Sequence, residues 1–138
     1  MMGAGPQPNE TSMLYVACGT GVAARTALSI NPNLEVSGVD SDPDILGIAS
    51  SILPQSNWCL ADGASLPFAD DHFDYALNKF GLMFFENRQA SVREMVRMTK
   101  PGGKIGVAVW GGLSETHAYS NILKALNDYL SVESLEFL

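Results

Sequence analysis

Short apolar runs alternate with segments of helical periodicity along most of this chain. The runs end at glycine, proline or acidic residues, which is typical of buried strands. They predict strands at 13–17, 34–39, 57–60, 73–80 and 104–110. Between them, apolar residues spaced three and four apart predict helices at 22–29, 43–52, 92–99 and 119–130.

The order of these elements predicts a fold class. Strands and helices alternate, except that the connection between Asp62 and Phe73 is too short for a full helix. Such alternation gives a mostly parallel sheet with helices on both faces. We therefore expect a doubly wound α/β core over residues 13–138, after a flexible segment at 1–12. A proline-glycine turn at 100–103 is expected to precede the fifth strand.

Composition limits the classes of partner. The chain has 138 residues, the size of one domain, and 8 Lys+Arg against 15 Asp+Glu give a net charge of −7. Binding to a nucleic-acid backbone or to an anionic membrane surface needs clustered cations, so we expect neither partner. Hydrophobic residues make up 46% and charged residues 17%, which excludes a disordered chain.

Cysteine use and hydropathy bear on the compartment. Cys18 and Cys59 have no Cys or His at ligand spacing, so we expect two free, buried thiols and no metal site. The first twelve residues hold neither Lys nor Arg and no apolar stretch, so no signal peptide is predicted. The longest unbroken apolar run, 107–110, is far shorter than a membrane span of about 20 residues. These features favour a cytoplasmic protein.

A glycine turn after the first strand is the first chemical feature. Gly19 and Gly21 lie between a predicted strand and helix, where glycine lets the backbone bend tightly and lets a ligand approach. Asp40 ends the second strand, and a carboxylate there can accept both hydroxyls of a ribose. Together with Ala24 these residues also satisfy the dinucleotide pattern G-x-G-x-x-A. The pattern favours a nucleoside ligand over a helix-capping turn with a nearby acid.

A second acidic turn follows the third strand, at Asp62-Gly63-Ala64. A carboxylate in this place can accept from an exocyclic amine such as that of adenine, and the backbone N–H groups after it can donate to ring nitrogens. An Asx turn that closes the strand explains the same residues. Both interpretations stay open at this point.

Four blocks of sequence carry a resemblance to a known family. Residues 14–21 (LYVACGTG) resemble motif I of class I S-adenosylmethionine-dependent methyltransferases. The resemblance continues through 38–43 (GVDSDP), 60–74 (LADGASLPFADDHFD) and 93–104 (REMVRMTKPGGK), in the family's order. The most similar subgroup is methyltransferase type 11, the ubiquinone/menaquinone-biosynthesis type. The last two blocks distinguish it from a nicotinamide-binding Rossmann protein, which has no reason to carry them.

The resemblance implies a Rossmann-like sheet of strand order 3-2-1-4-5 and a cofactor, S-adenosyl-L-methionine. It places the methionine and ribose part of the cofactor along the turn that contains Ala17, Cys18, Gly19 and Gly21. It gives Asp40 the ribose hydroxyls, Ser41 a place beside the adenine, and Asp62 and Gly63 the adenine edge. Asn78 and Lys79 are implied to contact the methionine end through backbone groups. No catalytic residue is implied, because alignment of methyl group and acceptor does most of the work.

Two positions depart from the family pattern. The family usually has an acid where this chain has Tyr15, and that acid helps to bind the cofactor's ammonium. It usually has glycine where this chain has Ala17, which an alanine suits only at negative φ.

Further residues have competing interpretations. The run from Phe80 to Phe85 is expected either in the core or as the apolar wall of an acceptor pocket. Trp110 has the same two alternatives, and His72 and His117 are expected to be solvated or capping rather than bases.

The sequence thus predicts methyl transfer to an unidentified small molecule. The alternative is a non-catalytic or degenerate S-adenosylmethionine-binding module, or a fragment of a larger methyltransferase; nicotinamide binding is a weaker third possibility. The resemblance further implies a domain truncated at both ends, without strands 6 and 7 and with the fifth strand as an open edge. An open edge favours self-association, as a homodimer, unless the chain comes from a longer gene product.

Overall fold

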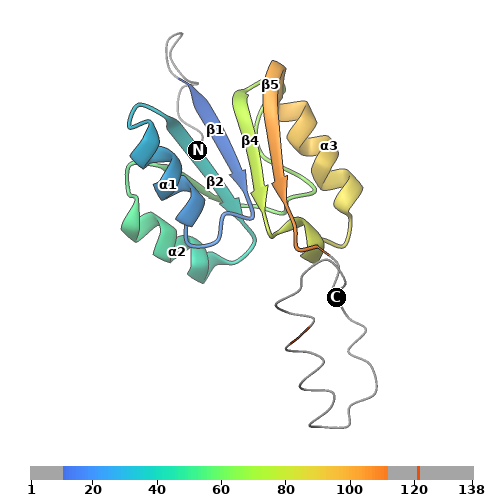
Figure 1. Cartoon of the computed structure of the whole chain (residues 1–138), viewed down its shortest axis with the longest axis horizontal. Helices are drawn as coiled ribbons and strands as arrows, with labels where there is room; N and C mark the ends of the chain where they lie inside the picture. Colours follow the sequence, from blue (N-terminus) through green and yellow to red (C-terminus); the bar gives the residue numbers. More distant parts are fainter. Residues whose placement is uncertain (1–10, 112–120, 122–138) are drawn as a thin grey trace, which may run out of the picture. The chain divides into compact units, whose positions relative to one another are not determined.

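A computed structural model describes residues 11–111 and residue 121 of the chain (Figure 1). Five parallel strands form one sheet in the order β3-β2-β1-β4-β5, as predicted. The strands are β1 (Ser12–Val16), β2 (Glu35–Asp40), β3 (Asn57–Leu60), β4 (Phe73–Lys79) and β5 (Thr99–Ala108). The helices are α1 (Val22–Ile30), α2 (Pro43–Ile52), the 3₁₀ turn η1 (Leu82–Phe84) and α3 (Arg88–Met98).

Helices cover the two faces of the sheet separately. In the central strand β1, Met13 and Tyr15 pack on the face that carries α1 and α2, whereas Leu14 and Val16 pack on the face that carries α3. This period of two on a fully buried strand explains why β1 carries no polar alternation from Met13 to Val16. Figure 1 shows α1 and α2 together beside β1 and β2, and α3 beside β4 and β5.

The helix starts follow the local sequence. The Asp42 carboxylate accepts hydrogen bonds from the backbone N–H groups of Asp44 and Ile45, so it caps α2, with Pro43 in the first turn as predicted. The Asn87 side chain caps α3 in the same way, through the N–H of Ala90. Both caps lie where the chain leaves the carboxyl end of a strand, so they fix the loops at that edge.

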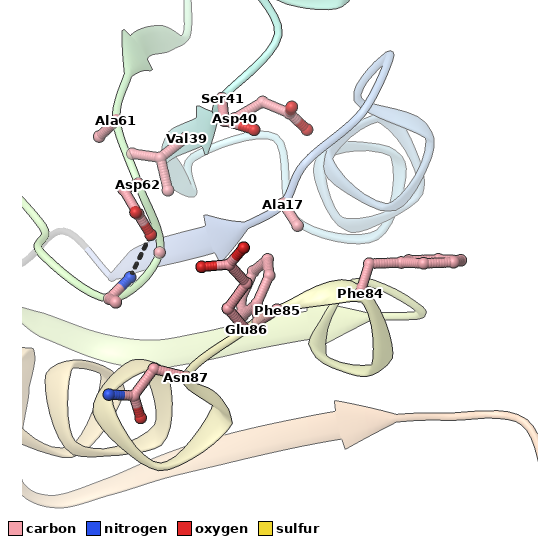
Figure 2. Close-up of a pocket in the computed structure, with 12 residues that line it drawn as sticks. Ala17, Val39, Asp40, Ser41, Ala61, Asp62, Phe84, Phe85, Glu86 and Asn87 are labelled. Carbon is pink, nitrogen blue, oxygen red and sulfur yellow. Dashed lines mark hydrogen bonds between the residues drawn. The ribbon is translucent and has the colours of Figure 1, made fainter.

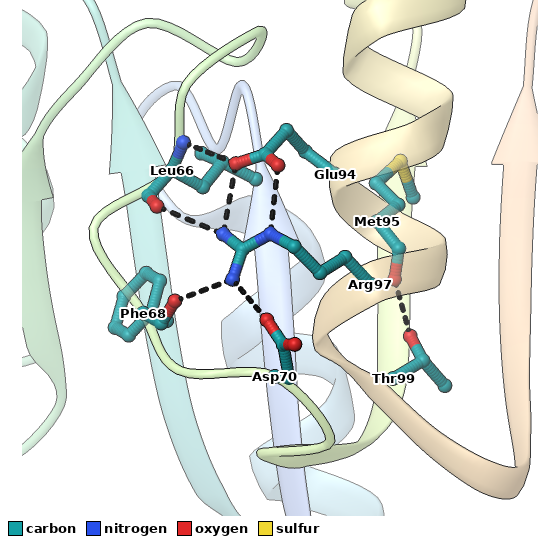
Figure 3. Close-up of polar contacts among 7 residues, drawn as sticks. All are labelled: Leu66, Phe68, Asp70, Glu94, Met95, Arg97 and Thr99. Atoms are coloured by element: carbon teal, nitrogen blue, oxygen red, sulfur yellow. Dashed lines mark hydrogen bonds and ion pairs between the residues drawn. The ribbon is translucent and has the colours of Figure 1, made fainter.

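The long connection between β3 and β4 contains no helix and is held by α3 instead (Figure 3). The Arg97 guanidinium donates to the carbonyls of Leu66 and Phe68 and pairs with the carboxylates of Glu94 and Asp70. Glu94 also accepts from the N–H of Leu66 at 2.7 Å. No local sequence pattern indicates this role of Arg97, because the carbonyls that it binds are remote in sequence.

The start of β5 corrects one prediction. A separate turn was expected at 100–103, but β5 already begins at Thr99 and pairs there with Phe73. The ladder then shifts register, so that Tyr75 pairs with Lys104, and Gly102 takes a φ of 80° within the irregular stretch. The proline-glycine pair therefore forms a bulge inside the strand, since proline cannot donate to the ladder.

Several expectations fall outside this description or stay open. The helix at 119–130 and His117 lie outside the described residues, apart from Asn121. The chain divides into two compact units, residues 1–108 and 109–138, and Trp110 belongs to the second. The assignment of 1–12 as flexible and 13–138 as the core stays a prediction. So does the homodimer, although β5 pairs only with β4 among the described strands and leaves Ile105 and Val107 40% and 46% exposed.

The predictions for cysteine, histidine and hydropathy have mixed outcomes. Both cysteines are free, and Cys18 is buried as predicted. Cys59 is only half-buried, so the prediction of a buried thiol is wrong there. His72 lies in the loop before β4 as expected, with its ring against Phe73. Within the described part of the chain, no helix is long and apolar enough to cross a membrane, and no group of metal-binding side chains gathers.

Candidate functional site

A pocket lies at the carboxyl end of the sheet (Figure 2). It encloses about 260 Å³ and is formed by the ends of β1, β2 and β3 together with the loop between η1 and α3. This edge of an open parallel sheet, on both sides of its central strand, is where such folds bind ligands. The lining residues are Ala17, Val39, Asp40, Ser41, Ala61, Asp62, Gly63, Ala64, Phe84, Phe85, Glu86 and Asn87.

Asp40 is held by the two loops that flank it. Its Oδ2 atom accepts from the N–H of Gly19 at 2.9 Å, and its Oδ1 atom accepts from the N–H of Asp42 at 3.1 Å. These bonds join the glycine turn to the end of β2 and fix the carboxylate at the pocket. Each carboxylate oxygen can accept a second hydrogen bond, so Asp40 retains capacity for a pair of hydroxyls.

Asp62 forms the Asx turn, and its adenine-binding interpretation stays a prediction. Its Oδ1 atom accepts from the N–H of Ala64 at 2.9 Å, which is the Asx turn. The same carboxylate is exposed and lines the pocket, together with the backbone of Gly63 and Ala64. A Cβ on Gly63 would lie 2.8 Å from the Phe85 ring, so glycine there lets Phe85 close one wall.

Ala17 does not have the negative φ that an alanine at this position was expected to need, because its φ is +54°. Left-handed backbone costs a residue with a Cβ about 1–2 kcal/mol. The methyl group fits because the facing residue is Gly81, whose ideal Cβ would lie 2.4 Å from the Cβ of Ala17. Where the family pattern has glycine at 17, this chain has alanine, and the glycine at 81 leaves the space that the alanine methyl group needs.

Tyr15 is removed from the pocket by burial. Its side chain packs with Met13, Cys18 and Leu46 on the face of the sheet that carries α1 and α2. Burial is the main cause that raises the pKa of Tyr15, followed by the nearby Cys18 and Asp40. The phenol therefore stays neutral and does not replace the acid of the family pattern.

Five of the predicted site residues do not line the pocket: Cys18, Gly19, Gly21, Asn78 and Lys79. Cys18 and Gly21 are buried residues of the turn, and burial raises the pKa of the Cys18 thiol to about 12, with a further contribution from the Asp40 charge. Gly21, at φ 81°, also leaves room for the Trp58 ring, which lies 3.0 Å from its ideal Cβ. Gly19 reaches the site through its bond to Asp40, and Lys79 ends β4 with an exposed side chain.

Asn78 is a support for the site rather than a wall of it. Its side chain is fully buried, and its Oδ1 atom accepts from the N–H groups of Gly81 and Leu82. These bonds shape the turn that leads into η1 and bring Gly81 against Ala17. Its Nδ2 atom has no hydrogen-bond partner in the described structure.

The residues from Phe84 to Asn87 form a wall that was only partly foreseen. The apolar run had two interpretations, and Phe84 and Phe85 take the pocket-wall one; Phe84 is 80% exposed. Glu86 and Asn87 were missed. The N-cap pattern of Asn87 before α3 could have marked the loop, but no sequence signal points to Glu86.

The charge of the pocket is one-sided. Asp40, Asp62 and Glu86 line it, and among the residues that the structure describes no Lys or Arg does. Among residues 11–111, none of these three carboxylates makes an ion pair. Such a wall suits a ligand with hydroxyl donors and positive charge, and it disfavours the pyrophosphate of a dinucleotide.

Comparison with known proteins defines the class of this domain. Residues 14–107 match the family described as a methyltransferase domain, so the chain belongs to that family. A demethylmenaquinone methyltransferase of Thermotoga maritima is 35% identical over 97 residues, which are 70% of this chain and 42% of that protein. The ubiquinone/menaquinone biosynthesis C-methyltransferase UbiE of Cupriavidus necator is 33% identical over 123 residues, 83% of this chain and 50% of that protein.

Solved structures agree on the Rossmann-like fold. The crystal structure of the [4+2]-cyclase SpnF superposes with a TM-score of 0.67 at 28% identity, covering 71% of this chain and 38% of that one. That protein is named a cyclase, so the fold by itself does not fix the reaction. The chain spans half or less of the length of the curated relatives named above.

The family match supports S-adenosylmethionine as the cofactor, and the pocket fits it. Asp40 and Asp62 can accept from ribose hydroxyls and an exocyclic amine, and the acidic wall suits a sulfonium. The fit is incomplete at position 15, where no carboxylate is available.

Proposed function

We propose that the chain carries out S-adenosylmethionine-dependent methyl transfer to a small-molecule acceptor. The observation that carries this proposal is the juxtaposition of Asp40, Asp62 and Ala17 around one pocket in a chain that belongs to the methyltransferase-domain family. Both relatives named above are named for menaquinone-type methylation. They support a small apolar acceptor more than a macromolecule.

In this proposal the described residues bind and orient. Asp40 accepts the ribose hydroxyls, and Asp62 with the backbone after it contacts the adenine edge. The bound cofactor supplies a methyl group on a positively charged sulfur, which is a good leaving group. The chain then contributes mainly alignment and exclusion of water, which the Phe85 ring favours where it closes one wall of the pocket.

A second candidate is a non-catalytic module that binds S-adenosylmethionine without turnover. The observation that favours it is Tyr15, which is buried and neutral where the resemblance implies an acid. The two candidates share the binding step and differ in turnover, so binding is measured first. Cytoplasmic localisation belongs to either candidate as a prediction.

The test is titration calorimetry of the chain with S-adenosylmethionine, S-adenosylhomocysteine and NAD. We expect both methionine-derived ligands to bind and NAD not to. Asp40→Asn should weaken both by tenfold or more, because one amide oxygen replaces two charged acceptors of the ribose. No heat with either methionine-derived ligand at millimolar concentration would contradict both candidates.

The matched control is Asp44→Asn, which removes the same charge from the first turn of α2, outside the pocket lining. It should bind like the wild type. A thermal melt of Asp40→Asn separates lost affinity from lost folding, since this side chain also holds Gly19 and Asp42. Turnover on quinol, catechol or amine acceptors then decides between enzyme and binding module.

A further inference from the structure

Glu86 differs from the other two carboxylates of the pocket. Asp40 and Asp62 each hold backbone N–H groups of their own loops. Glu86 makes no hydrogen bond or ion pair with any residue in the described part of the chain, and its side chain is exposed. Figure 2 shows this side chain rising from the loop before α3 toward the interior of the pocket. Its charge therefore serves no structural contact.

Strand order and the facing loop together indicate which part of the ligand this carboxylate meets. Asp62, Asp40 and Ala17 follow the strands in the spatial order β3, β2, β1. The loop that carries Glu86 lies across the pocket from them, since Phe85 of that loop packs against Gly63. If the adenine lies at Asp62 and the ribose at Asp40, the 5′ carbon and the sulfur lie farther along this series, beside Ala17. Figure 2 shows the Glu86 side chain on the facing wall, between Asp62 and Ala17, so it faces the part of the ligand that lies from the ribose to the sulfur.

We infer that Glu86 is a specificity-determining residue that distinguishes the charged sulfonium of S-adenosylmethionine from the neutral thioether of the demethylated product. The inference rests on the proposed function and adds to it. A carboxylate facing the sulfur attracts the substrate form and makes no corresponding contact with the product form. The binding site would therefore favour loading of S-adenosylmethionine and release of S-adenosylhomocysteine after transfer.

The size of the effect follows from the exposure of the site. A carboxylate open to solvent contributes modestly to a charge pair, so the expected preference is about three- to tenfold in dissociation constant. The preference should also shrink when the salt concentration rises from 50 to 500 mM, since the Debye length falls several-fold. Hydrogen bonding or packing by the same side chain would not produce this salt dependence.

The experiment is calorimetric titration of wild type, Glu86→Gln and Glu35→Gln with S-adenosylmethionine and S-adenosylhomocysteine. Glu86→Gln should weaken S-adenosylmethionine about three- to tenfold and change S-adenosylhomocysteine by less than twofold. Glu35→Gln is the matched control: it removes the same charge at the start of β2, opposite to the pocket edge. It should leave both dissociation constants unchanged.

Each other outcome contradicts the inference in a distinct way. Equal weakening of both ligands would place Glu86 at the shared ammonium or in the framework of the pocket. No change in either would show that the carboxylate does not face the ligand. If the wild type binds neither ligand, the proposed function fails, and the inference fails with it; if the wild type binds both, only the inference is at stake.

Discussion

Carboxylates have opposite surroundings at the amino ends and at the carboxyl ends of the parallel strands. At the amino-end edge, Asp74 accepts from the N–H of Ser12 at 2.9 Å and pairs with Lys100. On the face of the sheet that carries α3, Glu94 is bound by Arg97 and by the N–H of Leu66. At the carboxyl-end edge, Asp40, Asp62 and Glu86 have no cationic partner within residues 11–111.

The difference distinguishes carboxylates that hold the fold from carboxylates that the proposed function assigns to a ligand. Paired carboxylates close the sheet where chain segments remote in sequence must meet, and the hydrogen bonds to their charged form hold the pKa of Glu94 and of Asp74 below the usual range. Like charges left unpaired around a pocket repel one another and destabilise the fold slightly. A cationic ligand relieves that repulsion, which couples its binding to stability.

The largest expected effect comes from Arg97→Ala. This change leaves two carbonyls and two carboxylates without their donor and frees the connection from β3 to β4 (Figure 3). We expect the free energy of unfolding to fall by about 2–3 kcal/mol in urea titrations. Arg97→Lys should lose most of the same amount, because an ammonium cannot reproduce the planar fork.

Arg93→Ala is the control for this prediction, since Arg93 is exposed on the same helix and has no ion pair with a described residue. Its effect should stay within about 0.5 kcal/mol. Equal losses for Arg93 and Arg97 would remove the distinction between a structural network and an ordinary helix surface.

The second effect tests the pocket edge through Gly81. Gly81→Ala would place its new methyl group 2.4 Å from the methyl group of Ala17. We expect this overpacking to lower the free energy of unfolding by about 1–3 kcal/mol. Ala17→Gly removes the left-handed strain and the opposing methyl group. In that background Gly81→Ala should cost much less, so a double-mutant cycle should give a coupling of at least about 1 kcal/mol. Additive losses would show that the two positions do not share one space.

The sequence predicted the fold through local patterns and missed contacts between remote segments. Three features act within a few residues and can therefore be predicted from the sequence: the period of two in β1, the Asp42-Pro43 cap and the glycine turn. The roles of Arg97 and of the Ala17–Gly81 pair depend on residues that only the folded sheet brings together. Glu86 had no signal, because an isolated acid in a loop is typical of any surface.

The smallest effect concerns pH and compares Glu94 with Glu86. The pKa of Glu94 is lowered first by its bond to Arg97, so its folded pKa lies below its unfolded value of about 4.3. The resulting stability is present above the unfolded pKa and is lost as pH falls through the folded pKa. At pH 7 Glu94→Gln should therefore lower the free energy of unfolding by about 1 kcal/mol, and the difference from wild type should close as pH falls through the folded pKa. Glu86→Gln, which removes no described contact, should stay within about 0.5 kcal/mol of wild type at pH 7. Urea titrations at each pH measure both variants, and a loss at Glu86 equal to that at Glu94 would mean that the pocket carboxylate is structural after all.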